Sequence, residues 1–123
     1  MRLLTDCLVV ERTGAPLASR VFVADTWGSR LRGLIGRRPL APGEAIWILP
    51  CRQVHTHFLG YPLQLVFVDD DRRVARVIDT LRPWRISPWV DGAASVIELH
   101  AGHPAPVRTG DRLLRVPGDS RPR

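Results

Sequence analysis

The stretch LQLVFVDDDRRVARVI, residues 63–78, places two runs of β-branched and aromatic residues on either side of an acidic turn. Because Val, Ile and Phe favour strands and Asp favours turns, this pattern predicts an antiparallel hairpin. The turn itself consists of Asp69, Asp70 and Asp71. Three consecutive carboxylates cannot all face one cation, so we interpret them as a solvated turn and not as a calcium or magnesium site.

Similar runs continue on both sides of this hairpin. Each is short and rich in apolar residues, and turn-forming residues separate it from the next, a pattern that is typical of strands. These runs are residues 7–11, 20–24, 45–49, 53–59, 95–99 and 109–116. A turn over residues 13–16 separates the first two runs, which we therefore expect to pair as a hairpin. The chain as a whole predicts roughly seven or eight short strands.

Residues 26–36 differ from these runs, because their apolar residues recur near helical spacing. Asp25 or Thr26 can cap the first turn, Gly36 can end the helix, and Pro39 opposes its continuation. We therefore expect one main helix here. Short strands with a single helix predict a mainly β fold of the β-rich α+β class, in the form of a compact closed or half-closed β-barrel with the helix against one end.

The size and composition are those of a soluble globular protein. The chain has 123 residues, of which 45% are hydrophobic and 24% are charged, which is enough for one buried core. We expect a single domain over residues 1–116 and a flexible tail over 117–123. No apolar run approaches the roughly 20 residues of a membrane span, and the N-terminus lacks a signal-peptide pattern. These features predict a cytoplasmic monomer or weak dimer in which Cys7 and Cys51 are reduced.

Five segments occur in an order and spacing that resemble one known family. They are GLIGRRPL at 33–40, CRQVHTHFLGYPLQLVFVD at 51–69, LRPW at 81–84, SVIEL with the following AG within 95–102, and TGD at 109–111. The resemblance is to the domain of unknown function 192 family, also called uncharacterised protein family UPF0127, and it spans residues 20–115 approximately. It implies a compact β-rich domain and brings no established activity with it.

Two positions depart from the pattern of that family. Its members usually have a Met and an Asp where this chain has Leu59 and Gln64, whereas His55, Thr56 and Pro62 match. A carboxylate at position 64 would be the natural partner for the histidine. The amide that replaces it can form hydrogen bonds but cannot act as an acid or a base. The replacement therefore favours binding over catalysis.

Directly before the hairpin, one thiol and two imidazoles lie within seven positions of each other. If this segment is extended, its side chains alternate between two faces, so Cys51, His55 and His57 emerge on the same one. We predict that these residues line a ligand-binding pocket together with Trp47 and Trp84. Because no complete catalytic set accompanies them, we interpret the protein as a non-catalytic module that binds a small molecule or a protein partner without a cofactor.

Two other interpretations of the same cluster stay open. Cys51, His55 and His57 could ligate zinc or copper, because two imidazoles at i and i+2 on a strand can reach one metal ion. Alternatively, either imidazole could take the proton of the Cys51 thiol, which would make the protein a Cys/His-dependent enzyme. Against both stands the ordinary structural role, in which such a histidine forms a hydrogen bond and an isolated cysteine packs as a small hydrophobic residue.

All 18 basic residues are arginines, and with 12 acidic residues they give a formal net charge of +6. Arg30, Arg32, Arg37 and Arg38 lie on or beside the predicted helix, where they could contact phosphates. Arginine-driven nucleic-acid binding is therefore a second alternative function. We favour a solvated helical face instead, because the sequence contains no recognised nucleic-acid motif.

Overall fold

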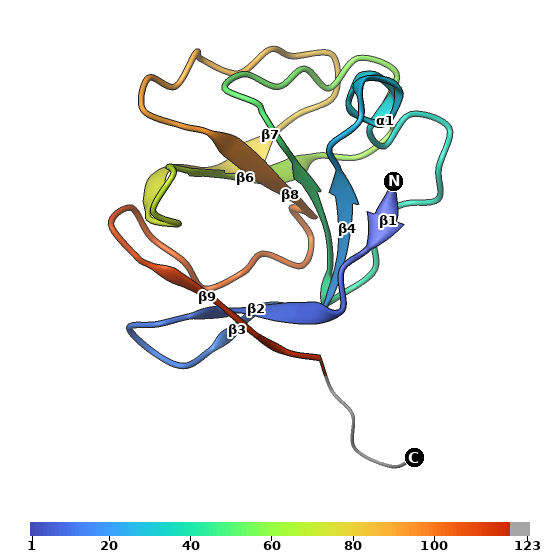
Figure 1. Ribbon diagram of the computed structural model, residues 1–123. Helices are drawn as coiled ribbons and strands as arrows, with labels where there is room; N and C mark the ends of the chain where they lie inside the picture. Colours follow the sequence, from blue (N-terminus) through green and yellow to red (C-terminus); the bar gives the residue numbers. More distant parts are fainter. Residues whose placement is uncertain (119–123) are drawn as a thin grey trace.

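A computed structural model describes residues 1–118 of the chain (Figure 1). These residues form one helix and nine strands, which confirms the β-rich α+β class. In chain order the elements are β1 (Arg2–Leu3), β2 (Asp6–Val10), β3 (Pro16–Ala18), β4 (Arg20–Ala24), α1 (Trp27–Arg32), β5 (Glu44–Ile48), β6 (Leu63–Val68), β7 (Val74–Leu81), β8 (Ser95–His100) and β9 (Leu113–Pro117).

The strands form two sheets that pack against each other and do not close into a barrel. The larger sheet has the order β1-β4-β5-β8-β6-β7 and the smaller one has the order β3-β2-β9. In Figure 1 the smaller sheet lies below the larger one, and α1 lies at the opposite end. A closed barrel would require the edge strands β1 and β7 to pair. In the described chain they remain the two outer strands of the larger sheet.

The central strands of the larger sheet are buried on both faces, which explains why β5, β6 and β8 are almost continuously apolar. One face packs against the smaller sheet and includes Val66 and Ile97. The other face includes Ile48 and Leu65, and it is covered by residues of the connections that flank β5 and precede β8. This second face carries the pocket described below.

The predicted hairpin over residues 63–78 is confirmed, because β6 and β7 pair antiparallel. The other predicted hairpin is wrong, since β2 pairs with β3 and β9, whereas β4 pairs with β1 and β5 in the larger sheet. The chain changes sheets at Ser19. The backbone N–H groups of Ser19 and Arg20 both donate to the Gly43 carbonyl, at 2.9 and 3.0 Å, which directs β4 alongside β5.

Helix α1 is shorter than the predicted range of 26–36. Thr26 caps it, and the side chains of Thr26 and Ser29 each accept a hydrogen bond from the other's backbone N–H. The helix ends at Gly33, whose φ of 51° lies in the left-handed region that glycine adopts without strain. The helix buries none of its own side chains, and Trp27 and Leu31 are 75% and 64% exposed.

The predicted strand over residues 53–59 is also wrong. A bend at Arg52 precedes the segment, and a turn at His57 and Phe58 interrupts it, with Phe58 at a φ of 66°. Between these points the alternation holds, since Val54 is buried and His55 is exposed. The only bridge of this segment in the described chain joins His55 to Ile86.

One residue of the predicted tail lies in a strand. Pro117 is the last residue of β9 and pairs with Asp6 of β2. Residues 119–123, which make up most of the predicted tail, lie outside the described part of the chain.

Candidate functional site

A pocket of about 280 Å³ lies between α1 and the second face of the larger sheet. Its wall combines the helix and residues 33–35 with the segment after β5 and the middle of β8. Much of the lining is apolar and includes Leu34, Ile48, Val54 and Leu59. The polar lining residues are Arg30, Arg32, Cys51, Gln53, His55 and Glu98. A cavity of this size suits a small ligand.

Glu98 supplies the one carboxyl group among the described lining residues. It lies on β8 between Ile46 of β5 and Leu65 of β6, in the interior of the larger sheet, and it is only 4% exposed. Burial raises the pKa of Glu98 to about 8, because it disfavours the charged form. Within the described chain, no ion pair or hydrogen bond of this carboxyl offsets the effect. At neutral pH Glu98 is therefore mostly an uncharged carboxylic acid that faces the pocket.

Cys51 enters the pocket from the connection after β5. Its thiol donates to the carbonyl of Gln53, with an Sγ–O distance of 3.1 Å. Burial raises the pKa of this thiol; the Gln53 hydrogen bond and Arg30 oppose that effect, and Glu98 reinforces it. The thiolate that nucleophilic or metal chemistry requires is therefore disfavoured at this position. Cys51 and Cys7 are both free, as the sequence predicts.

The rings of His55 and His57 lie side by side, with centroids 5.3 Å apart, but only one of them lines the pocket. His55 lines the pocket, whereas His57 packs edge-on against Trp84 with ring centroids 5.3 Å apart. The Phe58 ring packs against the same indole, with ring centroids 4.8 Å apart. We call His57, Phe58 and Trp84 the aromatic cluster. Trp84 is 54% exposed, and neither it nor His57 belongs to the pocket lining. The structure therefore brings Cys51 and His55 to the pocket and places His57 and Trp84 beside it.

Trp47 lies in the core between the two sheets. It pairs with Ile97 on β8, is 7% exposed, and donates from Nε1 to the hydroxyl of Ser95 at 2.8 Å. Because side chains alternate along β5, Trp47 projects from the face opposite to its pocket-lining neighbour Ile48. Its place in the structure is thus that of a core residue.

Thr56 and Gln64, two positions that the family pattern singles out, have structural roles. The Thr56 hydroxyl donates to the carbonyl of Arg82 and accepts from the backbone N–H of Arg85, which holds the two loops together. Gln64 forms two hydrogen bonds to the backbone of Ala105, at 2.7 and 3.2 Å. Because Gln64 alternates with the pocket-side residues of β6, its amide faces away from the histidines.

Arg30 is the basic residue most closely tied to the pocket. Its side chain lines the cavity, and its Nε atom is buried without a hydrogen-bond partner among the described residues. The terminal Nη1 atom lies 3.5 Å from the carbonyl oxygen of Pro50, at the limit for a hydrogen bond. The guanidinium is therefore only partly satisfied within the chain.

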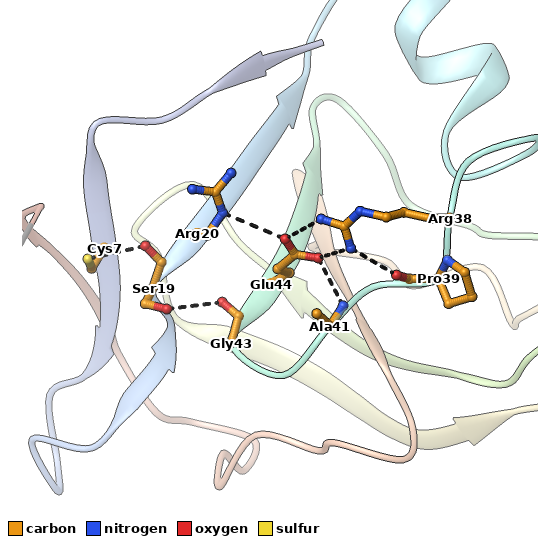
Figure 2. Close-up of polar contacts among 8 residues, drawn as sticks. All are labelled: Cys7, Ser19, Arg20, Arg38, Pro39, Ala41, Gly43 and Glu44. Carbon is orange, nitrogen blue, oxygen red and sulfur yellow. Dashed lines mark hydrogen bonds and ion pairs between the residues drawn. The ribbon is translucent and has the colours of Figure 1, made fainter.

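The other predicted anion-binding arginines are more fully engaged. Figure 2 shows Arg38 donating to both oxygens of Glu44, at 2.8 and 2.7 Å, with Arg20 3.6 Å from the same carboxylate. The hydrogen bond to Arg38 holds the pKa of Glu44 below its ordinary value. Arg37 and Arg32 donate from Nε to backbone carbonyls at 3.0 Å. Arg32, Arg37 and Arg38 line a second cavity of about 350 Å³, beside Glu44.

The three predicted metal ligands do not form one cluster, although His55 and His57 lie close together, with ring centroids 5.3 Å apart. Within residues 1–118, no group of three or more His, Cys, Asp or Glu side chains is close enough to hold a metal ion. The Cys51 thiol instead donates a hydrogen bond to the Gln53 carbonyl, and His57 also packs against Trp84.

Sequence reasoning missed Glu98, although a signal for it exists. In SVIELH the polar residue stands two positions after Val96 in an otherwise apolar run. A strand that is buried on both faces has no solvent-exposed side for a carboxylate, so an acid in its middle is either paired or placed at a cavity. The burial of both faces was not apparent from the sequence.

The fold and the pocket define a class of small, β-rich proteins with two packed sheets and a ligand-sized cavity beneath a short helix. Within this class the chain belongs to the DUF192 family, whose model, described as "Uncharacterized ACR", matches residues 8–114. A UPF0127 protein from Thermococcus sibiricus (strain DSM 12597 / MM 739) is 30% identical over 100 residues, which are 77% of this chain and 64% of that protein. The chain thus spans less than two thirds of that relative.

Two solved structures share the fold at 22% sequence identity. One is a Sinorhizobium meliloti 1021 protein, provisionally described as a transcription regulator, with a TM-score of 0.73 over 94% of this chain and 96% of its own. The other is a protein of unknown function from Novosphingobium aromaticivorans DSM 12444, with a TM-score of 0.75 over 91% and 84%. Among the residues that the structure describes, no helix has the length and apolar character needed to span a membrane.

Proposed function

We propose that this protein is a non-catalytic module that binds a small molecule in the pocket between α1 and the larger sheet. The observation that supports the proposal is Glu98, a buried carboxyl at the cavity wall without a partner in the described chain. Buried polar groups are ordinarily hydrogen-bonded, and a group that faces a cavity unpaired is poised to bind a ligand.

The same residues argue against chemistry at this site. The Cys51 thiol donates a hydrogen bond to the Gln53 carbonyl and has a raised pKa. In this arrangement neither histidine accepts the thiol proton, which activation as a nucleophile would require. Gln64 faces the opposite side of the sheet and cannot orient an imidazole. A binding role needs none of these groups to react, and it uses the cavity and Glu98 as they stand.

The proposal is tested by saturation-transfer NMR with a panel of small carboxylates, amides and amines. At least one compound should receive saturation from the protein and remain chemically unchanged after prolonged incubation. The variant Cys51→Phe fills the cavity and should abolish the signal, whereas Phe58→Ala, which alters the aromatic cluster, should leave it intact. Conversion of a compound, or a signal that only Phe58→Ala removes, would contradict the proposal.

Nucleic-acid binding ranks below this proposal. The description of the Sinorhizobium meliloti neighbour and the arginines near α1 favour it. However, Arg38 is neutralised by Glu44, and Arg32 and Arg37 already donate to backbone carbonyls. If phosphates were contacted here, affinity for a short duplex would fall log-linearly with salt, and Arg37→Gln would reduce that slope by about one unit.

A further inference from the structure

The charges around the pocket are unequal. Arg30 and Arg32 of α1 contribute two guanidinium groups to the pocket lining. Glu98, the one carboxyl among the described lining residues, is mostly uncharged at neutral pH. The chain as a whole carries a formal net charge of +6. The local potential is therefore positive, which favours an anionic ligand and opposes an ammonium group.

Arg30 and Glu98 also share one chemical requirement. The buried Nε–H of Arg30 has no acceptor among the described residues, and the protonated carboxyl of Glu98 has a hydrogen to donate. Leaving such groups unpaired costs free energy that a suitable ligand recovers. An anionic oxygen suits both, because charge-assisted hydrogen bonds to guanidinium and O–H donors are the strong ones.

The rest of the cavity limits the body of the ligand. Leu34, Ile48, Val54 and Leu59 provide apolar walls, so an aliphatic group is favoured there. The volume of about 280 Å³ corresponds to roughly nine water molecules, so the ligand has about ten non-hydrogen atoms or fewer. A nucleotide or a peptide of several residues would not fit wholly within this volume.

We propose that the pocket binds a small aliphatic monocarboxylate, whose anionic head accepts hydrogen bonds from Arg30 and from the Glu98 carboxyl and whose hydrocarbon body contacts the apolar walls. This inference rests on the proposed function and specifies its ligand. The charged and titratable groups that line the pocket with Glu98 are Arg30 and Arg32 on α1 and Cys51 and His55 on the segment after β5, and Tyr61 before β6 lies near enough to be affected by its charge.

The test is calorimetric titration with 3-methylbutanoate between pH 6.5 and 9.5. Only the protein with protonated Glu98 binds the anion well, so affinity should be level below pH 8 and fall about tenfold per unit above it. Glu98→Gln should bind and lose this dependence, because the amide retains a donor. Any pH dependence that survives in Glu98→Gln belongs to the thiol, the imidazole or Tyr61 and would contradict the proposal.

Arg30→Gln should weaken binding by about tenfold or more, the usual effect of losing a charged hydrogen bond. The matched control Arg85→Gln removes the same charge from an exposed arginine outside the lining, and it should change affinity less than twofold. Equal effects of the two substitutions would overturn the assignment of Arg30, since net charge alone would then explain them.

Two probes with the same five-carbon skeleton separate failure of this inference from failure of the proposed function. If 3-methylbutan-1-amine binds more tightly than the carboxylate, and more tightly as pH rises, the pocket function stands but the ligand class is wrong. A ligand with about seven non-hydrogen atoms is expected to have a dissociation constant in the millimolar range. If 3-methylbutanoate, its amide and the amine all fail to bind at concentrations about 20-fold above that constant, the ligand class and the proposed function are both wrong.

Discussion

Replacing Glu98 with Gln should make the protein more stable at high pH, by an amount that the burial of this group defines. Its pKa is raised from 4.5 to about 8 in the folded protein. The unfolded chain therefore releases this proton at a lower pH than the folded one does. The contribution of Glu98 to the free energy of unfolding is fully present below pH 4.5 and is lost as the pH rises through 8. A shift of this size corresponds to a loss of roughly 5 kcal/mol.

The assay is urea unfolding of wild type and Glu98→Gln at half-unit steps from pH 4 to 9.5. The difference in unfolding free energy should be level below pH 4.5 and above 8, and should grow by about 1.4 kcal/mol per unit between them. Other ionisable groups are common to both proteins and cancel. Parallel curves across the whole range would refute the reasoning, because they would mean that Glu98 titrates normally in the folded state.

Three further outcomes follow from residues around the pocket. Thr56→Val should cost about 1–3 kcal/mol in urea unfolding, because it removes a buried hydroxyl that accepts from the backbone N–H of Arg85 and donates to the carbonyl of Arg82; a loss below 0.5 kcal/mol would contradict the role of this hydroxyl. Gln64→Leu should increase hydrogen exchange at Ala105 and leave 3-methylbutanoate binding unchanged, and weaker binding would show that Gln64 serves the pocket. Cys51 should react with iodoacetamide at pH 8 more slowly than free cysteine, since its pKa is raised; faster alkylation would revive the nucleophile hypothesis.

Local sequence patterns predicted the strands well, because strand signals depend on residue type over a few positions. The hairpin over residues 63–78 and the strands near 45–49 and 95–99 were all correct. Pairing was harder to predict. After the turn that follows Val10, the chain pairs with β2 through Pro16–Ala18 and not through Arg20–Ala24. The reason is a long-range contact, because the backbone of Ser19 and Arg20 hydrogen-bonds to the carbonyl of Gly43, 24 positions after Ser19.

The candidate site was predicted in part for a similar reason. Cys51 and His55 both line the pocket, and the predicted alternation of side chains holds from Gln53 to Thr56. His57 does not line it, because a turn with a positive φ at Phe58 follows, and no glycine marks that turn in the sequence. Glu98 was missed because its significance depends on burial of both sheet faces, which only the long-range packing establishes.

Direct titration of the Glu98 carboxyl by carbon-13 NMR tests the central claim. We predict a midpoint near pH 8 in the protein alone, and a higher midpoint with saturating 3-methylbutanoate, because an anion that favours the protonated acid raises its pKa by reciprocal linkage. A midpoint near 4.5, or one that the carboxylate does not move, would contradict the account.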